Sequence, residues 1–292
     1  MASLQYKTFS KLLSLLPFQF RMKVLFFRRF RYFLNFNNVE TFNEKLQYKK
    51  AFDRNRLLPV AADKIASKGF VGGICPTLYI PKTIAVFKNS DEIGRFDLTT
   101  LPKNYVFKAN HTSQTIKIIK NGQHLPTRKM QSLANNWLKH DQASSLGEWA
   151  YQNIPRRVFI EEFLDFDGRE PDDYKFFVYH GRVHFIQLDS NRFIDHKRNM
   201  FDREWNDLEI EFSHSRKTPP PKKPIFLDSM IEIAEKIGTN FDFIRVDLYW
   251  FKNMVTFGEL TVYPGAGFEK FPTRDWDIEF GKPWMLKDAK KC

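Results

Sequence analysis

The chain has 292 residues, 42% of them hydrophobic and 16% aromatic, so it can bury a large core and is not disordered throughout. Its two cysteines, Cys75 and Cys292, exclude a disulfide scaffold and a zinc site built from cysteines, and they suit a reducing cytoplasm. The 46 Lys and Arg outnumber the 34 Asp and Glu, which gives a formal net charge of +12 and favours an anionic partner.

Most of this positive charge lies in residues 1–39, which contain seven Lys and Arg, many Leu and Phe, and no acid. Every stretch of about 20 residues in this segment contains a charged residue, so we predict a basic amphipathic helical lead segment and not a membrane-spanning helix. Pro17 and Arg21 interrupt the apolar region, which argues against a signal peptide. The segment either lies on an anionic membrane surface or packs on the body of the protein with its basic side in solvent. Nucleic acid is not expected as a partner, because residues 40–292 hold only +5 of the net charge.

The first half of the chain mixes helices and strands. A helix is predicted over 41–58, because Thr41 and Glu44 form a capping-box pair at its start. The further elements predicted in chain order are a helix at 60–70 that contains Lys64, strands at 104–110 and in the following IKIIK, a helix at 127–140, and an apolar strand at 156–164.

The second half favours antiparallel hairpins and therefore an α+β fold. One hairpin is predicted over 174–188, with His180-Gly181 at its turn. The remaining elements are an irregular charged span from Asn191 to about Lys223, an amphipathic helix at 226–238 and a second hairpin at 244–262.

The second hairpin brings two acids face to face. A three-residue loop at 252–254 places Asp247 opposite Glu259 and Arg245 opposite Thr261. Opposed like charges destabilise a sheet, so the pair predicts a divalent cation, and carboxylate oxygens suit Mg²⁺. Arg245 is placed to hold an anion beside that metal. The alternative is a solvated hairpin face with an Arg–Glu pair.

Candidate ligands for a nucleotide precede this hairpin. Lys108 stands in an apolar strand, where a buried ammonium needs an anion, unless its stem reaches solvent. Lys175 has the same interpretation more weakly, whereas Lys64 by itself suits a surface role. The 111–115 loop offers hydroxyls to phosphate. The end of the strand at Glu161, Glu162 and Leu164 either binds an adenine edge and ribose hydroxyls or is an ordinary solvated strand end.

Basic residues and glycines follow as candidates for substrate binding. A basic cluster could meet an acidic substrate, although such a cluster is usually a solvated loop, and a glycine-bearing loop, YPGAGF, follows the second hairpin. These candidates are Arg192, His196, Lys197, Arg198, Gly265 and Gly267.

In this order, the motifs resemble the ATP-grasp superfamily, and most of all its TupA-like branch, named after the teichuronopeptide biosynthesis protein. Together they cover roughly residues 40–280 and are specific, whereas none is convincing alone. The phrases are FNEKLQYKKAFDRNRLLPVAADK, FKANHTSQTIKI, IEEFL, DYKFFVYHGRVHFIQLDSNR, HKRNMFD, FIRVDLY and FGELTVYPGAGFEKF.

The resemblance implies an ATP-grasp fold, in which two α+β subdomains with antiparallel sheets hold ATP and Mg²⁺. The implied division is the lead segment 1–39, an N-terminal subdomain 40–103, a small lid subdomain 104–165, and a C-terminal subdomain 166–292 with the metal site. The implied roles are Lys64 and Lys108 for the ATP phosphates, Glu161, Glu162 and Leu164 for its adenine and ribose, Asp247 and Glu259 for the metal, and Arg245 with Lys108 in catalysis. Lys175 is added to the ATP-binding residues because of its place in an apolar strand.

Two departures from the family pattern affect these roles. Thr261 stands where many relatives carry an Asn metal ligand, and a hydroxyl is a weaker ligand for Mg²⁺. The 111–115 loop lacks the glycines that relatives usually carry there, so we expect a stiffer lid or phosphate contacts from hydroxyls.

The implied activity is that of an ATP-dependent carboxylate-amine ligase. It would form an amide, through an acyl phosphate, between the hexuronic acid carboxylate of a bacterial surface polysaccharide or its precursor and an amino acid or other amine. We expect the protein in the cytoplasm, and on the inner face of the plasma membrane if residues 1–39 bind lipid. The alternatives are a glycan kinase, a glycosyltransferase, or a non-catalytic ATP-grasp-like binding protein.

Overall fold

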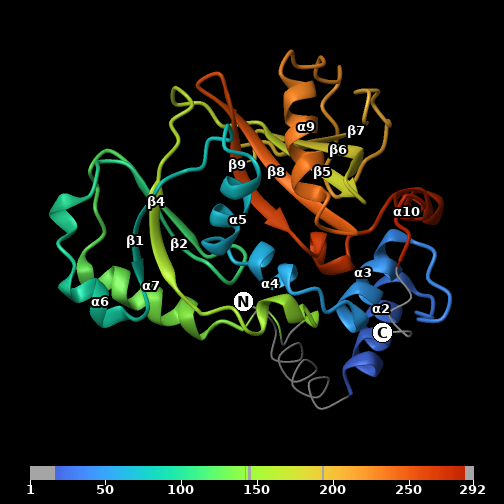
Figure 1. The fold of residues 1–292 in the computed structure, drawn as a ribbon, viewed down its shortest axis with the longest axis horizontal. Coiled ribbons are helices and arrows are strands. Elements are labelled where there is room, and N and C mark those ends of the chain that lie inside the picture. The colour runs from blue at the N-terminus through green and yellow to red at the C-terminus, as the bar shows by residue number, and fades with distance from the viewer. Residues whose placement is uncertain (1–16, 142, 144–145, 193, 287–292) are drawn as a thin grey trace.

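Two antiparallel sheets form the body of the protein (Figure 1). The structure is a computed structural model that describes residues 17–141, 143, 146–192 and 194–286. One sheet has four strands in the order β1-β4-β2-β3, and the other has five in the order β7-β6-β5-β8-β9. The strands are β1 Thr83–Phe87, β2 Tyr105–Ala109, β3 Ile116–Ile119, β4 Val158–Glu162, β5 Asp173–Tyr179, β6 Arg182–Ser190, β7 Lys197–Asp202, β8 Phe243–Phe251 and β9 Met254–Thr261.

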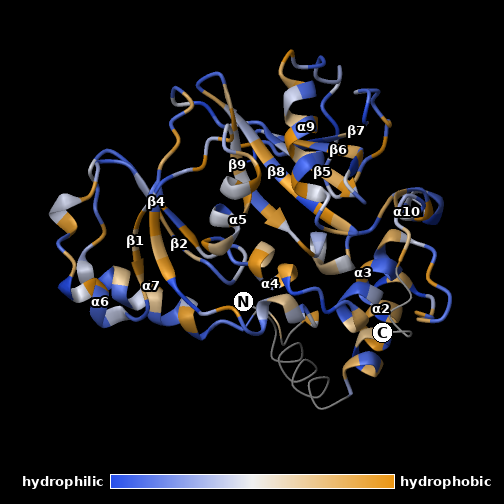
Figure 2. Cartoon of the chain, in the orientation of Figure 1, coloured by the Kyte–Doolittle hydropathy of each residue, from blue (hydrophilic) through white to orange (hydrophobic). Residues whose placement is uncertain are grey.

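Helices cover one face of each sheet, and in the five-stranded sheet α3 and α10 also cover part of the face that carries the charged side chains. Apolar residues of α6 and α7 form a core with Phe107 and Ile160 of the four-stranded sheet, and α9 packs on β5, β6 and β8. Figure 2 shows hydrophobic residues along both sheets. The helices are α2 Phe18–Phe30, α3 Phe42–Phe52, α4 Leu57–Ala62, α5 Ala66–Ile74, α6 Ser90–Arg95, α7 Thr127–Lys139, α9 Leu227–Gly238 and α10 Arg274–Gly281, with 3-10 turns η1 Leu98–Thr100, η2 Trp149–Tyr151 and η3 Pro264–Gly267.

The structure breaks the two helices that the sequence predicted between 41 and 70. The capping box at Thr41 is present, but α3 ends at Phe52, because the Asp53 side chain instead accepts the N–H of Asn55. The second break falls at Asp63, which is extended and accepts the N–H of Ile65. Lys64 therefore lies in a turn between α4 and α5 and not on a helix surface.

Both hairpins are where the sequence placed them, but the charged span between them is not irregular throughout. Tyr179 pairs with Arg182 around the His180-Gly181 turn, as predicted. The span from 191 to 223 contains β7, which pairs with β6. The subdomain boundaries remain predictions; β1, from the segment ahead of residue 103, pairs with β4 in the four-stranded sheet.

The described part of the lead segment packs on the body of the protein. Met22 and Phe26 of α2 are buried with Tyr48 and Ala51 of α3. Residues 1–16 lie outside the described residues. Among the described helices, none is both long enough and apolar enough to cross a membrane.

A β-bulge sets the register of the second hairpin. The structure confirms that Asp247 is opposite Glu259 and Arg245 is opposite Thr261. The predicted three-residue loop is wrong, however, because Phe251 pairs directly with Met254 around a two-residue turn. The pairing then shifts by one residue between Asp247 and Leu248, where Gly258 is the extra residue, and this shift restores the predicted register.

Replacing Gly258 with Ala is expected to destabilise the protein by about 1–3 kcal/mol, because its Cβ would lie 2.8 Å from the Asp247 backbone oxygen. Relief of that clash moves the strand that carries Glu259, so the ligase activity that the resemblance implies should fall as well. Urea unfolding and an activity assay measure both effects. Gly69→Ala is the control, because its Cβ would meet nothing within 4 Å; equal stability of the two variants would contradict this account of the bulge.

Candidate nucleotide and metal site

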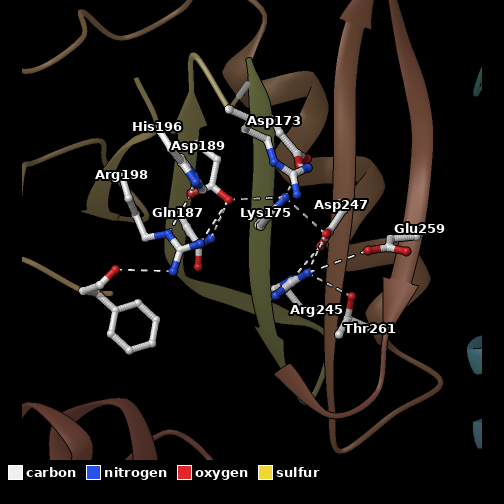
Figure 3. A network of polar contacts seen from close by, with 12 residues as sticks. Asp173, Lys175, Gln187, Asp189, His196, Arg198, Arg245, Asp247, Glu259 and Thr261 are labelled. Atoms are coloured by element: carbon white, nitrogen blue, oxygen red, sulfur yellow. Dashed lines mark hydrogen bonds and ion pairs between the residues drawn. The ribbon is translucent and has the colours of Figure 1, made fainter. Parts of the chain in front are cut away.

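Charged side chains from five neighbouring strands meet on one face of the five-stranded sheet (Figure 3). Lys175 in β5 lies opposite Gln187 on one side and Asp247 on the other. Asp247 in turn lies opposite Glu259. Because opposed side chains in a sheet share a face, strand pairing alone assembles this row of polar groups across four strands.

Arg245 holds Asp247 by two hydrogen bonds. Its Nε and Nη2 donate to Oδ1 and Oδ2 of Asp247 at 2.7 and 2.6 Å, and Lys175 Nζ lies 3.4 Å from Oδ2. Asp247 is only 2% exposed, and this burial raises its pKa against the opposing charges of Arg245 and Lys175. The carboxylate is therefore fixed in position and depends on two cations.

Glu259 is the accessible carboxylate of the pair. Its side chain is 43% exposed, with Lys64 Nζ at 3.8 Å and Arg245 Nη2 at 4.0 Å. Burial alone would raise its pKa, but the charges of Lys64 and Arg245 outweigh burial and lower it. Glu259 is thus an ionised carboxylate without a short ion pair to either cation.

The pair Asp247 and Glu259 fits a magnesium ion that completes its shell with phosphate oxygens and water. In the described part of the chain no group of three or more His, Cys, Asp or Glu is arranged to hold a metal, so the protein offers two carboxylates and no closed cage. Thr261, the third predicted ligand, accepts a hydrogen bond from Arg245 Nη2 at 3.0 Å. Its hydroxyl orients the guanidinium in this arrangement.

The predicted basic cluster does not behave as a solvated loop. Arg198 is 7% exposed and donates from Nε and Nη2 to Asp189 at 2.7 and 3.2 Å. His196 Nε2 lies 3.2 Å from the same carboxylate, and Arg192 donates to Asp173 at 2.7 Å. Lys197 does not join them: its Nζ lies 3.2 Å from Asp195 and 3.1 Å from Ser215 Oγ.

Two acids, Asp173 and Asp189, explain why these cations gather. They lie directly opposite each other and are 2% and 1% exposed. Lys175 forms an ion pair with Asp173 and lies 3.7 Å from Asp189 Oδ2. Burial alone would raise the pKa of Asp189, but Arg198 and Lys175 lower it. The sequence analysis did not single out either acid; the Asp-x-Lys spacing at the start of β5 was the available signal.

The four-stranded sheet contributes a second cluster of lysines. Lys108 Nζ lies 2.6 Å from Glu161 Oε1, and Lys68 of α5 forms an ion pair with the other oxygen of that carboxylate. Both ammonium groups also lie over the ring of Phe159, at 5.3 and 5.6 Å from its centroid. The sequence analysis did not single out Lys68, because it assigned Lys64 and Lys68 to one helix and gave that helix a surface role.

Glu162 and Leu164, the other two residues predicted to bind adenine or ribose, follow Glu161 at the end of β4. Glu162 accepts hydrogen bonds from the Tyr79 hydroxyl at 2.7 Å and from the Lys82 N–H at 3.0 Å, and Leu164 is half-buried two residues beyond. The Glu162 carboxylate thus ties the strand end to the neighbouring segment in this structure, and the role of Glu162 toward adenine or ribose stays a prediction.

Aliphatic side chains surround Lys108 on the same face. Val86, Ile116 and Ile118 are 43%, 51% and 38% exposed, and Ile116 lies directly opposite Lys108. Exposed aliphatic groups next to paired lysines suit a ligand with a flat apolar part and a polyanionic part, as a nucleotide has.

Lys64 reaches from this cluster to the metal candidates on the other sheet. Its Nζ donates to the Thr112 carbonyl at 2.9 Å and lies 3.8 Å from Glu259 Oε2. Asn110 fixes the turn around Lys64, because its side chain donates to Asp63 at 2.9 Å and to the Pro155 carbonyl at 3.0 Å. Burial lowers the pKa of Lys64. The surface role that suited Lys64 from sequence alone is therefore wrong.

The start of the 111–115 loop is enclosed, whereas Ser113 and Gln114 are exposed. His111 and Thr112 are 2% and 1% exposed. The Thr112 hydroxyl donates to the Ser113 carbonyl at 2.9 Å and lies 3.3 Å from Thr115 Oγ1. These contacts order the loop without glycine.

We expect the contribution of His111 to the stability of the protein to fall as the pH drops from about 6.5 to about 4. Burial of His111, and next the charge of Arg156, lowers the His111 pKa from 6.5 to about 4. Between these values the unfolded state binds more protons than the folded state, so acid favours unfolding. Urea unfolding of the wild type and of His111→Gln across this range measures the effect; the variant should lose less stability, and equal losses would contradict the assignment.

The glycine loop is held against α3. Gly265 and Gly267 adopt φ of +53° and +67°. Gln47 donates to the Gly267 carbonyl at 2.8 Å, and the buried Lys50 donates to the Ala266 carbonyl at 2.5 Å. These contacts give the loop a fixed shape near the end of β9.

Comparison with known proteins identifies the family. A family model described as TupA-like ATP-grasp matches residues 44–285, most of the chain. No curated protein sequence matches. One similar solved structure is the D-alanine–D-alanine ligase of Bacillus anthracis, complexed with ATP, at 11% identity over 81% of this chain and 69% of that chain, with a TM-score of 0.45. A second is the D-alanine–D-alanine ligase of Helicobacter pylori, at 14% identity over 78% of this chain and 62% of that chain, with a TM-score of 0.44. A third is the VanG D-Ala:D-Ser ligase of Enterococcus faecalis, at 16% identity over 80% of this chain and 61% of that chain, with a TM-score of 0.42.

The chain covers 60% and 62% of the first two solved structures that it matches. Identities this low bear on the fold alone. The family match, which covers both sheets and the site described above, carries the assignment: the chain belongs to the TupA-like ATP-grasp family and has its α+β ATP-grasp fold.

Proposed function

We propose that the protein is an ATP-dependent ligase that joins an amino acid or another amine to the carboxylate of a hexuronic acid in a bacterial surface polysaccharide or its precursor. Membership of the ATP-grasp superfamily supports ATP-dependent ligation. The observation that carries the proposal is the opposition of Asp247 and Glu259 beside Arg245, with Lys64 reaching them from the other sheet.

The chemistry proceeds in two balanced steps. The substrate carboxylate attacks the γ-phosphorus of ATP, which forms an acyl phosphate and releases ADP. The amine then attacks the acyl carbon, the C–O bond to phosphate breaks, and the amine loses a proton, so that an amide and inorganic phosphate remain. The protein needs no nucleophile of its own for either step; it aligns the groups and neutralises charge.

The side chains fit these tasks. In this proposal Lys64, Lys108 and Lys175 bind the nucleotide phosphates, and Arg245 faces the transferred phosphoryl group. Asp247 and Glu259 would hold Mg²⁺, which when bound neutralises charge between the phosphates. Glu161, Glu162 and Leu164 would bind adenine and ribose near the exposed aliphatic groups.

The acidic substrate would lie along the cations at the open edge of the network. Arg192 has a side chain that is 44% exposed while it is anchored on Asp173, so it offers charge to a carboxylate. His196 and Arg198, which bind Asp189, would line the same edge. The backbone at Gly265 and Gly267 would contact the substrate.

The deciding experiment is mass spectrometry of the purified protein with ATP, Mg²⁺ and a panel of uronic acids and amino acids. A ligase gives a conjugate that weighs one water less than its two substrates, together with ADP and phosphate. A phosphorylated sugar would instead identify a glycan kinase. Binding of ATP without turnover of any pair, checked by calorimetry, would favour the non-catalytic binding protein.

A further inference from the structure

The exposed side of α2 carries aromatic rings and cations together. Phe20, Phe27 and Phe33 are 55%, 38% and 77% exposed, and the rings of Phe27 and Phe33 stack with centroids 4.6 Å apart. Figure 2 shows hydrophobic and hydrophilic residues alternating along this helix. The exposed cations of the same segment are Lys23, Arg28, Arg29 and Arg31.

The opposite side of α2 is fixed to the protein. Met22 and Phe26 are fully buried, and Arg29 Nε donates to the Phe268 carbonyl at 2.7 Å. The exposed rings therefore do not pack in the core of the described protein. The other side of the helix makes the contacts with that core. Aromatic side chains kept in water next to cations need another partner.

We propose that the exposed face of α2 together with the turn that follows it, made of Phe20, Phe27 and Phe33 with Lys23, Arg28 and Arg31, binds an anionic membrane surface. The rings enter the interface and the cations meet the headgroups. Charge complementarity supports this occupant, because residues 1–39 contain seven cations and no acid. Nucleic acid fits less well, because two of the three rings stack on each other and the remainder of the chain is only weakly basic.

Membrane binding through this face would place the proposed substrate loop behind α2, one helix diameter (~10 Å) from the lipid surface. Phe268, which Arg29 contacts, directly follows the glycine loop Pro264–Gly267. An acceptor carried on a lipid would then reach the site without leaving the membrane. This consequence rests on the proposed function, whereas the binding itself does not.

Co-sedimentation of the full-length protein with vesicles tests the binding. We expect binding to phosphatidylcholine vesicles that contain phosphatidylglycerol, weak binding to phosphatidylcholine alone, and a loss at about 1 M salt, where the Debye length shrinks to about 3 Å. Joint replacement of Phe20, Phe27 and Phe33 by Ser should weaken binding at least tenfold. Replacing Lys23, Arg28 and Arg31 by Gln should cost about fivefold per charge.

The matched control is Ile194→Ser with Ile225→Ser, which removes two side chains that are 87% and 100% exposed elsewhere. The control should bind like the wild type, and all variants should melt at similar temperatures and process soluble substrates equally. Equal vesicle binding by the Phe and control variants would overturn the proposal, as would salt-steep binding to oligonucleotides without binding to vesicles.

A tryptophan placed on this face distinguishes binding to lipid from burial of the face by another part of the chain. The wild type already emits from six tryptophans, so its spectrum is subtracted from that of Phe33→Trp. The difference spectrum should shift to the blue only after anionic vesicles are added. A difference spectrum that is already blue-shifted without vesicles would mean that another part of the chain covers the face, and the proposal would fail.

Discussion

The variant Glu259→Gln is expected to lower kcat by about a thousandfold and to leave the fold intact. The amide keeps the size of the side chain but removes the charge that would hold Mg²⁺ and balance Lys64. Losses of about 10²–10³ are typical when one group that stabilises transition-state charge is removed. Because the side chain is 43% exposed and its nearest cations lie at 3.8 and 4.0 Å, its contribution to stability is small.

The measurement pairs steady-state kinetics, by release of ADP, with thermal unfolding. Glu279→Gln is the control, because Glu279 has a similar side-chain exposure of 46% and pairs with Lys282 on α10, away from the site. Magnesium titration adds a second readout: the Glu259 variant should need more Mg²⁺ for half-maximal ATP binding. Full turnover in Glu259→Gln would remove the metal assignment and, with it, the main support for the proposed function.

The sequence predicted those parts of the site that one strand pair encodes. Alternation along β8 and β9 placed Arg245, Asp247, Glu259 and Thr261 on one face, and the structure confirms that register. The predicted loop was one residue too long, and the bulge at Gly258 compensates for it. A single glycine in a strand was the local sign of that bulge.

Residues that meet only through tertiary structure were not predictable in the same way. Asp173 and Asp189 become important because β5 and β6 oppose them and β7 brings Arg198 alongside, whereas the sequence around β7 reads as irregular and charged. Lys68 depends on where α5 docks against β4. Local periodicity carries no information about either packing step, so these residues become visible only when the sheets and helices are assembled.

Replacing Arg245 with Met is expected to destabilise the protein by about 3–5 kcal/mol as well as to abolish turnover. The substitution leaves the Asp247 carboxylate, only 2% exposed, with Lys175 at 3.4 Å as its remaining cation. Loss of one partner from a buried ion pair costs this much, because the other charge stays out of water. Urea unfolding near pH 7 measures the change in the free energy of unfolding.

The control for the ion pair itself is Arg203→Met. Arg203 also binds a carboxylate through Nε and Nη2, that of Glu235 at 3.0 and 3.3 Å, but its side chain is 36% exposed. Surface pairs contribute about 0–1 kcal/mol, so this variant should unfold almost like the wild type. Equal losses from the two arginines would show that burial of Asp247 does not govern the effect.

A double variant separates stability from catalysis. Arg245→Met with Asp247→Leu removes both charges, so most of the lost stability should return, since apolar replacement of a buried pair is often neutral. Turnover should remain absent, because the side chain proposed to face the phosphoryl group and one of the two magnesium ligands are both missing. A double variant that is stable and still active would show that these two residues hold the sheet together without taking part in the reaction.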